Sequence, residues 1–67
     1  MNVLLLKSKM TLNEDTQEDL ANALGITRNT LLSRFSKSSS FTQVEISKIR
    51  DRYNLEDNEI IDIFFPD

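Results

Sequence analysis

The stretch LANALGITRNTLL, residues 20–32, contains the only glycine in this chain of 67 residues. Apolar and small side chains precede Gly25, and Thr27 follows it by two positions. Glycine accommodates the left-handed backbone that often follows a helix end, where a Cβ costs about 1 kcal/mol. Threonine is favoured at a helix start because its hydroxyl accepts an otherwise unpaired backbone N–H. The stretch therefore predicts two short helices joined by a tight turn.

Helix start signals recur elsewhere in the chain. Thr16-Gln17-Glu18-Asp19 is a near capping box that opens the helix before Gly25, and Thr42-Gln43-Val44-Glu45 is a capping box for a helix that runs to about Asn54. Further helices are expected from Asn2 to about Leu12 and from about Asp57 to Phe65, where Pro66 stops the last one. No stretch alternates over enough residues to predict a strand. The predicted fold is all-α, with five short helices in one domain over residues 1–67.

The apolar positions of these helices predict a single shared core. None of the stripes is long enough to stabilise an isolated helix. Residues 36–40, SKSSS, are predicted to form a loop. The expected core positions are Val3, Leu5 or Leu6, Met10, Leu20, Ala21, Leu24, Leu31, Phe35, Val44 or Phe41, Ile46, Ile49 and Tyr53.

The composition excludes several classes of function. The chain has no cysteine and no histidine, so the commonest general base and the commonest metal ligands are missing. Residues 3–6 form an apolar run too short for a signal peptide or a membrane span. We therefore expect a cytoplasmic protein without membrane segments, and neither an enzyme nor a metal- or cofactor-binding protein.

Charge is unevenly distributed along the chain. The net charge is −3, yet residues 26–50 hold five basic residues against Glu45 alone. Both flanking segments are acidic. A confined basic segment in an acidic chain indicates a local contact surface rather than bulk attraction to nucleic acid.

The spacing around Gly25 adds a specific signal. Small Ala21 lies where two helices must cross closely, Gly25 follows four residues later, and Leu31 is placed to hold the second helix. The segment TQEDLANALGITRNTL, residues 16–31, resembles the helix-turn-helix of the lambda-repressor-like (Cro/cI-type) family. The resemblance covers about residues 3–65 and implies a helix-turn-helix at about residues 16–36. Residues 36–65, SKSSSFTQVEISKIRDRYNLEDNEIIDIFF, are also similar to small phage Cro-like regulators.

This resemblance implies a sequence-specific transcriptional regulator, a phage Cro-like repressor, that binds the half-sites of double-stranded operator DNA. In such a protein the helix at about residues 28–35 lies in the major groove. A helical projection independently places Asn29 and Ser33 away from the core side marked by Leu31 and Phe35. The expected base contacts are Arg28, Asn29, Thr30 and Ser33.

Two further groups of residues are expected to support binding. Phosphate contacts are expected from Gln17, Thr27, Arg34, Lys37, Ser38 and Thr42. Arg34 and Lys37 could equally be solvated surface charges, and the serines an ordinary loop. The last helix is apolar on more than one face, which predicts a homodimer contact through Ile61, Phe64 and Phe65.

A different class of function also fits the sequence. A protein-interaction module, such as an antirepressor or antitoxin that binds a second regulator, is compatible with the net charge of −3 and the apolar end.

Overall fold

The structure is a computed structural model that describes residues 1–36 and 41–66, and these residues form five α-helices without any strand. In chain order the helices are α1 (Val3–Leu12), α2 (Gln17–Leu24), α3 (Arg28–Ser36), α4 (Gln43–Tyr53) and α5 (Asp57–Phe64). The predicted all-α class is confirmed, and the helix bounds agree with the expected ones to within one residue or so. None of the described helices is long and apolar enough to cross a membrane.

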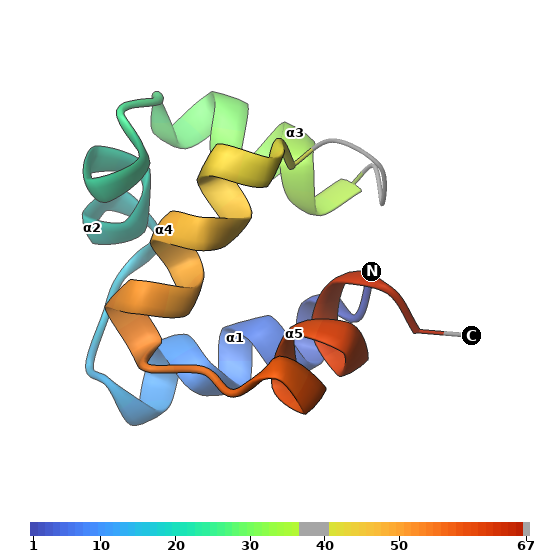
Figure 1. The fold of residues 1–67 in the computed structure, drawn as a ribbon. Coiled ribbons are helices and arrows are strands. Elements are labelled where there is room, and N and C mark those ends of the chain that lie inside the picture. Colours follow the sequence, from blue (N-terminus) through green and yellow to red (C-terminus); the bar gives the residue numbers. More distant parts are fainter. Residues whose placement is uncertain (37–40, 67) are drawn as a thin grey trace.

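The helices form two groups that α4 connects. As Figure 1 shows, α2 and α3 lie at one end of the molecule beside α4, whereas α1 and α5 pack together at the other end. The backbone N–H of Asn2 donates to the carbonyl of Ile63 over 2.6 Å, and Lys9 pairs with Glu59. These contacts join α1 to α5 at both ends of their interface.

Local capping explains where the helices begin. In α2 the Thr16 hydroxyl accepts the Asp19 N–H over 3.0 Å, and the Asp19 carboxylate accepts the Thr16 N–H over 3.0 Å. In α4 Thr42 and Glu45 form the same reciprocal pair, over 3.1 and 2.9 Å. Both predicted capping boxes are confirmed.

One core joins side chains from all five helices. Its five largest fully buried residues are leucines and isoleucines contributed by each helix in turn. They are Leu6, Leu20, Leu31, Ile49 and Ile63. Such a shared core supplies the burial that none of the short helices has alone.

The structure decides between the two core positions left open, Val44 and Phe41, and corrects one expected loop boundary. Val44 is 63% exposed, and Phe41 packs on the core in its place because Val44 lies on the solvent side of the first turn of α4. Ser36, expected in the loop, is the last residue of α3, and its hydroxyl donates to the Leu32 carbonyl over 3.2 Å. The rest of the expected loop, residues 37–40, lies outside the described residues.

Candidate nucleic-acid interface

A short turn at residues 25–27 joins α2 to α3, and the two helices run in different directions (Figure 1). Gly25 has φ +73°, and the N–H of Ile26 donates to the Ala21 carbonyl over 3.0 Å. Ala21 is buried, and α2 lies against both α3 and α4. The turn satisfies the last carbonyls of α2 and leaves Thr27 in place to start α3.

The start of α3 is capped by threonines. The Thr27 hydroxyl accepts the Thr30 N–H over 3.1 Å and donates to the Thr30 hydroxyl over 2.9 Å. Leu31, one residue later, is fully buried. The cap and the buried leucine together fix how α3 is rotated about its axis.

The exposed surface of α3 is polar apart from Leu32, which is 38% exposed. Arg28, Asn29 and Ser33 are exposed, whereas Thr30 is half-buried. No acidic residue occurs within α3. The four residues expected to contact bases thus lie on one short helix, with three of their side chains open to solvent.

The starts of α2 and α3 face a common hollow of about 390 Å³. Gln17, at the first position of α2, and Arg28, at the first position of α3, both line it together with Thr16 and Glu18. The structure thereby brings together a residue expected at a phosphate and a residue expected at a base. Glu18 adds a negative charge at this hollow, which opposes an anion bound directly in it.

Arg34 is only partly exposed and forms an ion pair with Glu45, unlike the solvent-exposed residues of α3. Its guanidinium donates to Glu45 Oε2 over 3.1 Å, and the two side chains are 25% and 9% exposed. The other carboxylate oxygen of Glu45 accepts the Thr42 N–H. Arg34 and Thr42, both expected at phosphates, therefore belong to one network between α3 and the start of α4.

The other residues expected at phosphates differ in what the structure says of them. Thr27 and Thr42 are exposed, although both hydroxyls cap their own helices. Lys37 and Ser38 lie outside the described residues.

The apolar end of α5 is divided between core and surface. Phe64 is 7% exposed and packs edge-on against Phe41, with ring centroids 5.7 Å apart. Ile61 and Phe65 are 55% and 61% exposed. Of the three residues expected at a dimer contact, Ile61 and Phe65 are therefore exposed to solvent, whereas Phe64 belongs to the core.

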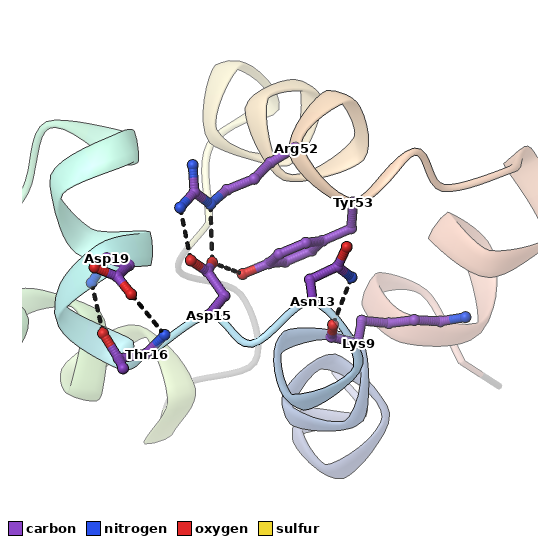
Figure 2. A network of polar contacts seen from close by, with 7 residues as sticks. All are labelled: Lys9, Asn13, Asp15, Thr16, Asp19, Arg52 and Tyr53. Carbon is purple, nitrogen blue, oxygen red and sulfur yellow. Dashed lines mark hydrogen bonds and ion pairs between the residues drawn. The ribbon is translucent and has the colours of Figure 1, made fainter.

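A polar cluster that sequence reasoning did not assign ties the α1–α2 connection to α4. Figure 2 shows the Asp15 carboxylate between Arg52 and Tyr53. Arg52 donates two hydrogen bonds of 2.6 and 2.8 Å, and the Tyr53 hydroxyl donates one of 2.5 Å. Asp15 directly precedes Thr16, so the cluster anchors the chain where α2 begins.

The charges of this cluster shift one another's protonation. The hydrogen bonds from Arg52 hold the pKa of Asp15 below its ordinary value of 3.8, with the Tyr53 hydroxyl and the Arg52 charge adding to the effect against burial. Burial, followed by the bond to Asp15, raises the pKa of Tyr53. Asp15 is thus held as a carboxylate and Tyr53 as a neutral donor.

Lys7 also makes a contact between helices that the sequence did not predict. Its ammonium lies 5.5 Å from the centroid of the Phe35 ring, in a cation–π contact between α1 and α3. This contact brings a cation from α1 beside the last turn of α3.

Comparisons of the chain with known protein families, with curated proteins and with solved structures found no significant match. Within residues 1–36 and 41–66, no group of three or more acidic side chains gathers in a way that could hold a metal ion.

Proposed function

We propose that the protein is a sequence-specific DNA-binding transcriptional regulator, a repressor of the Cro-like kind, in which α2 and α3 form a helix-turn-helix. The observation that carries this proposal is the exposed polar surface of α3, where Asn29 and Ser33 lie opposite the buried Leu31 and Arg28 is exposed in the first turn. A helix that is anchored on one side and polar on the other fits the major groove of duplex DNA.

Each residue of that face has a defined task in this proposal. Arg28 donates to the O6 and N7 atoms of guanine, and Asn29 pairs with the N6 and N7 atoms of adenine. Each such pair discriminates against a wrong base by about 1–3 kcal/mol. Ser33 and Thr30 supply further contacts along the groove.

Phosphate contacts flank the base contacts and set the register. Gln17 and the amides of the first turn of α2 contact one phosphate despite the nearby charge of Glu18, and the exposed helix starts at Thr27 and Thr42 offer others. Lys37 and Ser38 are also proposed as phosphate contacts, whereas Arg34, the remaining residue of the set expected from the sequence, is paired with Glu45. The net charge of −3 keeps non-specific affinity low, so binding depends on the groove contacts.

A homodimer would let two copies of α3 read the two half-sites of an operator. The exposed Ile61 on α5 and Phe65 directly after it support a self-complementary contact. Analytical ultracentrifugation of the protein on its operator is expected to show two chains per duplex. One chain per duplex at tens of micromolar protein contradicts the dimer.

The test of the proposal compares two double variants on one duplex. A tight-binding duplex is first selected from a random pool, and its affinity is then measured by gel shift. Arg28→Ala with Asn29→Ala should weaken binding by at least about 30-fold, because two bidentate base contacts are lost. Arg50→Ala with Asn58→Ala removes the same residue types from exposed positions on α4 and α5.

This matched control should bind within a few-fold of the unaltered protein. Equal affinities for all three proteins would rule out α3 as the reading helix.

The exposed apolar side chains of Ile61 and Phe65, at the end of α5, also favour a second candidate function, a protein-interaction module such as an antirepressor or antitoxin that binds another regulator. The dependence of binding affinity on salt concentration distinguishes the two functions. DNA affinity falls steeply with salt concentration in proportion to the phosphates contacted, whereas an apolar protein contact hardly responds.

A further inference from the structure

We infer that Arg34 and Glu45 are positioning residues that hold the last turn of α3 against the start of α4, rather than a phosphate contact and a helix cap acting separately. The role of this contact in DNA reading rests on the proposed function, whereas the contact between Arg34 and Glu45 does not depend on it.

The geometry places one carboxylate at the junction of the two helices. Glu45 is buried, with 7% of its surface exposed. One of its oxygens accepts the Thr42 N–H over 2.9 Å at the start of α4, and the other accepts the Arg34 guanidinium over 3.1 Å. A single side chain therefore fixes both where α4 begins and where the end of α3 lies.

The buried carboxylate of Glu45 is stabilised by the positive charge of Arg34. Removing one partner of a buried ion pair leaves an uncompensated charge, which is more damaging than losing an exposed pair. Arg34 is itself 25% exposed in its side chain, so the effect is smaller than for a fully buried pair.

The pair completes a two-point attachment of α3. The first turn is held by the Gly25 turn and the Thr27 cap, and the last turn by Arg34 on Glu45. A helix held at both ends keeps a fixed rotation and tilt. Arg28, Asn29 and Ser33 then meet base edges in one register, as base discrimination requires.

A phosphate contact and a positioning role predict opposite effects for Glu45→Gln. Glutamine keeps the capping box, since its amide oxygen can accept the Thr42 N–H. It removes the negative charge beside Arg34 and points an amide donor at a guanidinium donor. If Arg34 binds phosphate, the change releases a cation and strengthens DNA binding. If Arg34 positions α3, the change weakens discrimination.

The experiment measures the affinities of Glu45→Gln, Arg34→Gln and the double variant for the selected duplex and for an unrelated duplex, over a range of salt. Arg50→Gln and Glu56→Gln are exposed controls with the same charge changes, on α4 and at the start of α5. Each single variant should lower the ratio of selected to unrelated affinity at least tenfold, and the double variant no further. For Arg34→Gln on the unrelated duplex, the slope of log affinity against log salt concentration should equal that of the unaltered protein.

Two results together would overturn the inference in favour of a phosphate contact. Glu45→Gln would bind DNA more strongly, and the slope of log affinity against log salt concentration for Arg34→Gln would be smaller in magnitude by about 0.9, the value for one phosphate.

Amide hydrogen exchange without DNA keeps the test independent of the proposed function. Glu45→Gln and Arg34→Gln should each speed exchange at residues 33–36 at least tenfold, while Arg50→Gln and Glu56→Gln should not. Unchanged exchange in both pair variants overturns the inference. If no duplex is bound but the exchange result holds, the proposed function fails and the attachment of α3 stands.

Discussion

At the scale of single residues, the path of the chain depends on Gly25. Its φ of +73° ends α2 and directs the chain to Thr27 within two positions. A methyl group built there has nothing within 4 Å, so packing does not oppose a side chain. The cost of any other residue lies in the left-handed backbone alone.

Gly25→Ala should therefore lower the free energy of unfolding by about 1 kcal/mol, without a change of fold. Gly25→Asn should lose less, because asparagine tolerates the left-handed region, as Asn54 does at φ +53° after α4. Urea unfolding of the three proteins measures both differences. A fully stable Gly25→Ala would show that the turn does not need this backbone conformation.

At the scale of helices, the signals that predict the fold are local. Thr16, Gly25 and Thr42 act on backbone groups within four residues, so their residue types alone indicate where a helix starts or stops. Which face of a short helix is buried depends on its neighbours instead. For this reason the sequence left the choice between Val44 and Phe41 open, and the structure shows that Phe41 packs on the core.

Thr16→Ala tests the cap of α2. Loss of the hydroxyl leaves the Asp19 N–H without its acceptor and should lower the free energy of unfolding by about 1 kcal/mol. Thr11→Ala is the matched control, because that exposed hydroxyl only donates to the Lys7 carbonyl within α1. Thermal unfolding should show a clearly lower midpoint for Thr16→Ala, and equal midpoints would contradict the role of the cap.

At the scale of the whole molecule, ion pairs join segments that are far apart in the sequence. Asp15 binds Arg52, Lys9 binds Glu59, and Arg34 binds Glu45. In the sequence these residues have the appearance of ordinary solvated charges, and no spacing rule links them. The exposed face of α3 could be predicted because helical geometry decides it, whereas the contacts that orient α3 could not.

Asp15 should make stability depend on acid pH. Its pKa is lower in the folded protein than the value of about 3.9 expected in the unfolded chain. Its contribution is therefore complete above about pH 4 and is lost as the pH falls through the folded-state pKa. Asp15→Asn should be less stable by about 1–2 kcal/mol at pH 7, and the difference from the unaltered protein should narrow toward pH 2.

Urea unfolding at several pH values between 7 and 2 provides the comparison, with the exposed Asp62→Asn as control. A constant difference at all pH values would show that the Asp15 charge does not contribute.

The central claim is that the polar face of α3 contacts duplex DNA. The most direct measurement follows the backbone amide signals of the protein by NMR as a selected duplex is added. The account predicts shifts concentrated at residues 27–36 and at the start of α2. Shifts confined to α5, or none with excess duplex, would contradict it.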